Sequence, residues 1–204
     1  LVADCVAAMK AAVAVPVTVK CRIGVDEQDP EPALDEIADK VFAAGADALW
    51  VHARKAWLQG LSPKENRDIP PLDYERVYRL KQRLPERFIG INGGIPGVAE
   101  AVQHLRAVDG VMLGRAAYHT PAILADVDAT FHDGEPRQVD WQAFVEEMAA
   151  YADRHIAAGG RLAHVTRHMV GLFHGLPGAR RYRQILSTDA TKPGATGAVL
   201  RRAF

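Results

Sequence analysis

The stretch Val51-His-Ala-Arg-Lys-Ala-Trp-Leu-Gln-Gly-Leu-Ser-Pro-Lys-Glu-Asn-Arg67 joins the end of an apolar strand to a long loop that is basic, aromatic and punctuated by glycine. Connections between a strand and a helix usually take about 2–6 residues, and this loop is much longer. Long loops on a rigid strand commonly carry function. The stretch therefore predicts a buried strand that delivers His52 into a functional site.

The same pattern of strand followed by helix extends over the first part of the chain. Apolar strands are expected at residues 17–22, 48–54, 88–92 and 110–114, with helical periodicity in the segments between them. This alternation predicts parallel strands joined by right-handed crossovers. Since four consecutive units make half of an eight-fold barrel, we expect residues 1–120 to form half of a (β/α)8 TIM barrel.

After Pro121 no strand signal remains, and helical patterns continue to Phe204. Asp140 is expected to cap one helix that ends at Gly159-Gly160, and two more helices are expected beyond it. The formal net charge of the chain is zero, yet residues 161–204 hold eight Arg and Lys residues and only one acidic residue. We expect residues 121–204 to form a basic helical domain that binds phosphate or nucleic acid.

The composition, with 49% hydrophobic and 25% charged residues over 204 positions, is that of an ordinary globular protein. Apolar runs stop short of the roughly 18 residues that span a bilayer, and no secretory start is visible, so a cytoplasmic location is expected. Cys5 and Cys21 lack metal-ligand spacing. We expect two reduced core thiols and no metal site.

Strand parity assigns the side chains near the strand ends to two faces. Lys20 and Arg22 share one face, whereas Cys21 points to the other, apolar face, which argues against Cys21 as a nucleophile or acid. The same alternation turns His52 inward, at about the level of Lys20. In parallel α/β barrels the carboxyl ends of the strands carry the working residues, so this histidine is expected to contact a ligand.

Two glycine motifs follow the last two strands, namely Asn92-Gly-Gly94 and Gly114-Arg115. Glycine lets backbone amides approach a phosphate, a following helix start adds its positive end, and an arginine adds charge. Each motif alone could be a plain turn. Together with Lys20 and His52 they favour a phosphorylated cofactor, and the two cationic donors suit the polar edge of a flavin ring.

In these and further motifs the chain resembles the A subfamily of the FMN-dependent tRNA-dihydrouridine synthases. The likeness covers nearly the whole chain, including Gly178-Ala-Arg-Arg-Tyr-Arg183. The motifs that carry it are Val19-Lys-Cys-Arg-Ile-Gly24, His52-Ala-Arg-Lys-Ala-Trp-Leu58, Gly60-Leu-Ser-Pro-Lys-Glu-Asn-Arg67, Asn92-Gly-Gly-Ile95 and Val111-Met-Leu-Gly-Arg-Ala-Ala-Tyr118.

The resemblance implies an oxidoreductase that uses FMN, with NADPH as electron donor, to reduce uridines of the 20/20a type in the D-loop of tRNA. It implies FMN contacts from Lys20, His52, Asn92, Gly93, Gly94, Gly114 and Arg115. It implies tRNA contacts from Lys64, Arg67, Arg180 and Arg183. A uridine in folded tRNA must be splayed out to reach a flavin, so a basic surface is expected to hold the rest of the RNA.

One feature of the family pattern is missing. The family's catalytic cysteine belongs to a Gly-Cys-Pro-type loop after the fourth barrel strand, and this chain has no such motif. We therefore assign no catalytic residue and expect a fragment that cannot turn over tRNA alone. The open edges of a half barrel are expected to pair with another copy or with the missing half.

Two other functions are compatible with parts of the pattern. Another FMN-dependent barrel oxidoreductase acting on a small pyrimidine-like molecule would share the phosphate motifs and the inward lysine. It would not need Lys64, Arg67 or a basic helical segment. A non-catalytic RNA-binding fragment is consistent with the missing cysteine.

Overall fold

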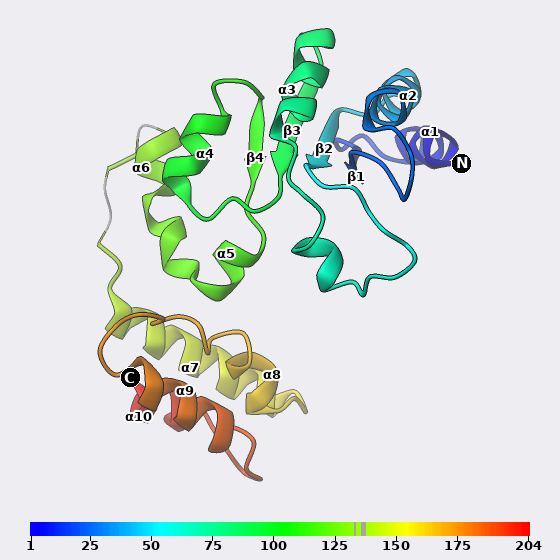
Figure 1. The fold of residues 1–204 in the computed structure, drawn as a ribbon. Helices are drawn as coiled ribbons and strands as arrows, with labels where there is room; N and C mark the ends of the chain where they lie inside the picture. Colours follow the sequence, from blue (N-terminus) through cyan, green and yellow to red (C-terminus); the bar gives the residue numbers. More distant parts are fainter. Residues whose placement is uncertain (133, 136–137) are drawn as a thin grey trace. The chain divides into compact units, whose positions relative to one another are not determined.

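The computed structural model describes residues 1–132, 134–135 and 138–204 and shows an α/β protein (Figure 1). The chain divides into two compact units, residues 1–114 and residues 115–204. Each unit is described by itself below.

The first unit contains a parallel sheet of four strands in the order β1-β2-β3-β4. The strands are β1 (Thr18–Arg22), β2 (Ala48–His52), β3 (Phe88–Asn92) and β4 (Gly110–Met112), and the helices are α1 (Val2–Ala12), α2 (Pro30–Ala43), α3 (Tyr74–Arg83) and α4 (Val98–His104). The prediction of a parallel α/β arrangement is confirmed. β2 and β4 each end two residues earlier than expected.

The strands pair without stagger at their carboxyl ends. Arg22 lies opposite His52, His52 lies opposite Asn92, and Asn92 lies opposite Met112. Lys20 lies opposite Trp50 instead, one pleat before this row. The expectation that Lys20 and His52 are level is therefore wrong, because parity fixes the face of a side chain but not its neighbour on the next strand.

The two faces of the sheet follow the predicted alternation. Leu49, Val51, Ile89 and Ile91 are fully buried in the core that the helices cover. Cys21 packs against the same core, and burial raises the pKa of its thiol to about 12. The thiol is therefore protonated at neutral pH, which agrees with its exclusion as a nucleophile.

The prediction that Cys5 is a core thiol is wrong, because its side chain is exposed. Helix α1 buries only Val6, while Val2, Met9 and Val13 each keep about half of their surface accessible. Much of the apolar side of this helix is thus exposed rather than packed against the described residues.

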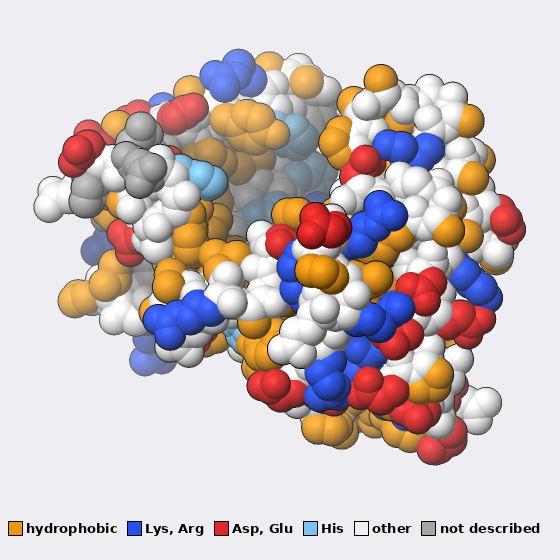
Figure 2. All heavy atoms as spheres, turned by 90° about the horizontal axis from the view of Figure 1, so that it is seen from above, with side chains coloured by type: hydrophobic (Ala, Val, Ile, Leu, Met, Phe, Trp, Pro, Cys, Tyr) orange, Lys and Arg blue, Asp and Glu red, His pale blue; other side chains and the backbone are white. Residues whose placement is uncertain are grey.

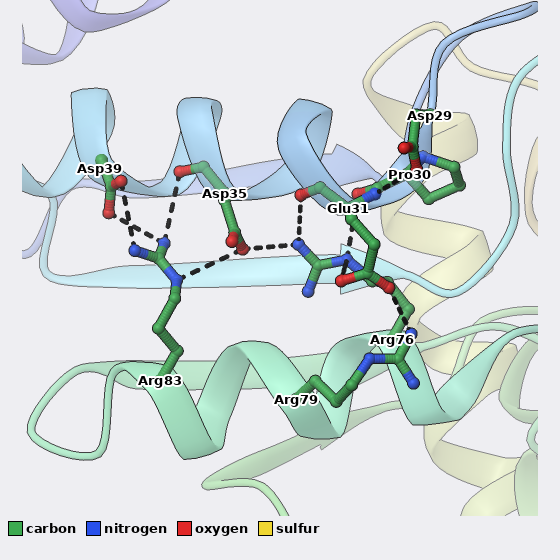
Figure 3. Close-up of polar contacts among 8 residues, drawn as sticks. All are labelled: Asp29, Pro30, Glu31, Asp35, Asp39, Arg76, Arg79 and Arg83. Atoms are coloured by element: carbon green, nitrogen blue, oxygen red, sulfur yellow. Dashed lines mark hydrogen bonds and ion pairs between the residues drawn. The ribbon is translucent and has the colours of Figure 1, made fainter.

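Charged side chains fasten α2 to α3 (Figure 3). Arg76 is 1% exposed, and its guanidinium donates to the Pro30 carbonyl oxygen at 3.0 Å and to Asp35 at 2.5 Å. Arg83 pairs with Asp39 at 2.9 Å, two turns further along α3 and one turn further along α2. A buried guanidinium requires such partners. Figure 2 shows acidic and basic side chains interspersed on the surface in view, rather than a field of one sign.

The second unit is helical, and its described residues 115–132, 134–135 and 138–204 contain no strand. Its elements are α5 (Arg115–His119), the 3-10 segment η2 (Pro121–Asp126), α6 (Val127–Phe131), α7 (Trp141–Ala157), α8 (Leu162–Thr166), α9 (Ala179–Thr188) and α10 (Ala198–Ala203). The side chain of Asp140 caps α7 as expected, accepting from the Ala143 amide at 2.9 Å. Across the part of the chain that the structure describes, no helix has the length and apolarity to cross a bilayer.

In the first unit, Trp50 lies across the neighbouring strands. A Cβ atom added at Gly90 would stand 2.2 Å from the Trp50 ring, and one added at Gly110 would stand 2.8 Å from it. The ring also contacts Phe88 at a centroid distance of 5.4 Å. Glycine at both positions is thus a packing requirement of the tryptophan.

We expect Gly90→Ala to lower the free energy of unfolding by about 1–3 kcal/mol, because the added methyl group overpacks the Trp50 ring. Gly114→Ala is the matched control, since a Cβ atom there meets nothing within 4 Å. Urea denaturation of both variants checks the expectation. Equal stability of the two would contradict this role of Trp50.

Candidate functional site

The candidate site lies at the carboxyl ends of the parallel strands, on the face opposite the apolar core. Lys20, His52 and Asn92 all come from this face. Burial, and to a lesser degree Arg22, lowers the pKa of Lys20 below its ordinary value. The lysine therefore lies in partly desolvated, positively charged surroundings, which favour binding of an anionic or electron-rich group.

The Asn92-Gly-Gly94 turn brings backbone close to His52. Gly93 has φ +122° and Gly94 has φ +65°, both in the region that favours glycine. A Cβ atom at Gly93 would stand 3.4 Å from His52 Nε2, and one at Gly94 would stand 2.7 Å from a Leu72 methyl group. Side chains are thus excluded from a turn whose backbone borders the histidine.

Asn92 itself holds the end of the sheet together. Its Nδ2 donates to the Met112 carbonyl oxygen at 2.6 Å, at the point where the short strand β4 ends. The hydroxyl group of Tyr74 donates to the Gly93 carbonyl oxygen at 2.7 Å. These two bonds orient the glycine turn before any ligand arrives.

The second glycine motif differs from the first. Gly114 is exposed, does not have a positive φ, and has open space where a Cβ atom would stand. Nothing within the first unit therefore requires glycine there. Arg115 begins α5 and belongs to the second unit. Lys20, His52 and the Asn92 turn lie in the first unit, and Arg115 lies at the start of the second.

Arginines gather beside the strand ends. The pKa of Arg22 is lowered by burial and then by the neighbouring charges of Arg54 and Arg67. Arg54 donates through Nη1 to the Pro70 carbonyl oxygen, and its buried Nε has no acceptor among the described residues. The sequence indicates Arg54 as a polar residue at the strand end, two positions after His52, but assigns it no contact. Three arginines therefore add positive charge beside the strand ends.

The long loop after β2 is held in one conformation by Arg22 and Asn66. Arg22 Nη1 donates to the carbonyl oxygens of Lys55 and Asn66, both at 2.8 Å. The Asn66 side chain accepts from the Trp57 amide at 2.7 Å and donates to the Trp57 carbonyl oxygen at 2.6 Å. Asp26 accepts from the Leu58 amide at 2.7 Å. The loop is therefore an ordered extension of the strand ends.

The expected RNA contacts are exposed in both units. Lys64 and Arg67 flank Asn66 at the short 3-10 turn η1 (Glu65–Arg67), so the fixed loop presents both. Arg180 and Arg183 are exposed on α9, three residues apart and thus on one side of the helix. Over the described ranges, no group of three or more His, Cys, Asp or Glu residues is arranged to hold a metal ion.

Cations and a glycine turn at the ends of parallel strands are features found in α/β proteins that bind phosphorylated ligands. The whole chain, residues 1–204, matches the family described as dihydrouridine synthase (Dus). The chain belongs to this family.

Among its curated relatives, the tRNA-dihydrouridine(20/20a) synthase of Shewanella oneidensis is 53% identical over 204 residues. The proteins of the same name from Salmonella typhimurium and Yersinia pestis are 52% and 50% identical over 205 residues. These alignments cover all of this chain but only 61%, 62% and 59% of the respective relatives. The chain thus spans about three fifths of the length of the relatives that it matches.

Proposed function

We propose that this chain is the part of a tRNA-dihydrouridine synthase that binds FMN and contacts tRNA. The activity of the complete polypeptide would be the NADPH-driven, FMN-dependent reduction of uridines 20 and 20a in the D-loop to 5,6-dihydrouridine. The observation that carries the proposal is the set of Lys20, His52 and the Asn92 turn on one face at the strand ends.

The donor set at the strand ends fits FMN. Lys20 and His52 would hold the polar edge of the flavin ring, where cationic donors stabilise negative charge. The backbone of the Asn92 turn would approach the phosphate, because both glycines exclude side chains there. By resemblance, Gly114 and Arg115 would contribute as well. When bound, FMN would supply the hydride for C6 of the uracil, and these residues would bind and orient the flavin.

The architecture of the whole protein is part of the proposal. We propose that the four strand-helix units are the C-terminal half of a TIM barrel and that residues 121–204 act as the helical tRNA-binding domain. β1 and β4 are the outer strands of the sheet, so their free edges would pair with the other half of the barrel or with a second copy. A stable monomer of this chain in light scattering would contradict that pairing.

The loop after β2 supports tRNA over a small-molecule substrate. Lys64 and Arg67 are exposed, and the bonds of Arg22 and Asn66 fix the segment that carries them. A dehydrogenase of a free pyrimidine needs no such exposed cations, whereas an RNA backbone does. A purely RNA-binding fragment would in turn need no glycine turn beside an inward-facing histidine.

The test is the dihydrouridine content of tRNA treated with the complete polypeptide, FMN and NADPH, measured by nucleoside mass spectrometry. Lys64→Ala, Arg180→Ala and Arg183→Ala should each lower the initial rate about tenfold, because each removes a charge-assisted contact to RNA. Arg201→Ala is the matched control, since Arg201 is already paired with Glu146 at 2.7 Å. Unchanged rates in all three variants would refute the RNA assignment.

A further inference from the structure

The second unit contains a pocket of about 330 Å³ that lies outside the site described above and shares only Arg183 with the expected RNA contacts. No acidic residue lines it. Its charged and aromatic lining residues are Tyr118, His119, Arg167, His168, His174 and Arg183. They come from the end of α5, the turns after α8 and the helix α9. The pocket therefore joins side chains that can bind an anion from three separate segments.

A chain of hydrogen bonds orients the hydroxyl group of Tyr118. Arg167 Nε donates to His168 Nε2 at 3.0 Å, so this ring nitrogen is an acceptor. The Nδ1 atom of a neutral His168 then carries the proton and donates to Tyr118 Oη at 2.8 Å. The hydrogen of the Tyr118 hydroxyl is left to donate to another group. These two hydrogen bonds therefore leave the Tyr118 hydroxyl group as a hydrogen-bond donor at the pocket.

Arg167 and Arg183 supply the formal positive charge of the pocket. Among the described residues, no carboxylate lies within ion-pair distance of Arg167 or Arg183. Other arginines of this unit do have such partners, since Arg201 pairs with Glu146 and Arg202 pairs with Asp189. The two arginines of the pocket are therefore available to an anionic ligand.

The walls of the pocket are in backbone contact. A Cβ atom at Gly171 would stand 2.1 Å from the carbonyl oxygen of His119, so only glycine allows this approach. The segment after α5 and the turn after α8 therefore meet without an intervening side chain. This close contact fixes the spacing between His119 on one wall and Arg167 on the other, so the pocket is formed before a ligand binds.

We propose that this pocket binds a phosphodiester of the RNA backbone together with its ribose. The proposal rests on the proposed function and extends it to Tyr118, His119, Arg167 and His174. Guanidinium and imidazole groups with an oriented hydroxyl donor are the groups that recognise phosphate oxygens. The pocket is larger than a bare phosphate needs, and its lining side chains are exposed, as a contact to a long polymer requires.

The experiment measures tRNA affinity of the complete, FMN-loaded polypeptide over a range of salt concentrations. Arg167→Gln should weaken binding about tenfold at low salt and reduce the slope of log K against log salt by about 1. Tyr118→Phe keeps the ring and removes only the hydroxyl group, and it should weaken binding several-fold. Arg201→Gln removes the same formal charge from a paired arginine and should leave both affinity and slope unchanged.

The outcomes separate this pocket from the proposed function. If the unsubstituted protein binds and modifies tRNA while Arg167→Gln and Tyr118→Phe behave like Arg201→Gln, the pocket assignment alone is overturned. If the variants lose FMN instead of tRNA affinity, the anion bound there is the flavin phosphate and the assignment to RNA is wrong. If the unsubstituted protein does not bind tRNA, the proposed function fails and this inference fails with it.

Discussion

The in-register pairing of the parallel strands is the constraint on which the rest of the site depends. It places Arg22, His52 and Asn92 side by side, and it is fixed by the opposite face of the sheet, where Leu49, Val51 and Ile91 are fully buried. A slip of one residue would turn these apolar side chains away from the helices. Burying a side chain of this size contributes about 1.5–3 kcal/mol, so the core holds the register strongly.

Arg22 connects the sheet to the long loop. It lies in the last pair of the β1–β2 ladder, and its guanidinium donates to two carbonyl oxygens of the loop. The same loop presents Lys64 and Arg67. The position of these exposed cations therefore follows from the register of the strands rather than from the sequence of the loop alone. One arginine thereby links the proposed flavin edge to the proposed RNA contacts.

The alternation of side chains predicted much of this arrangement. Apolar residues at every second position predicted the two faces correctly, and they separated Lys20 and His52 from Cys21. The spacing of strands and helices predicted the parallel sheet. These features depend on local periodicity, which a single sequence contains.

Features that depend on contacts between distant segments could not be predicted in this way. The pairing of Arg22 with His52 is a property of the register between strands. Helix α8 ends at Thr166, and the turns that follow it bring Gly171 against His119. Cys5 is exposed because α1 buries only Val6. The bonds that join Arg167, His168 and Tyr118 span fifty residues and have no local signal.

The central claim is that the strand ends hold a flavin, and a fluorescence titration of the apo form of the complete polypeptide with FMN tests it most directly. Lys20→Gln should weaken FMN binding about tenfold or more, because it removes a charged donor from the proposed flavin edge. Arg180→Ala, on a helix of the second unit, should bind FMN as tightly as the unsubstituted protein. Equal FMN affinity of Lys20→Gln and the unsubstituted protein would contradict the account.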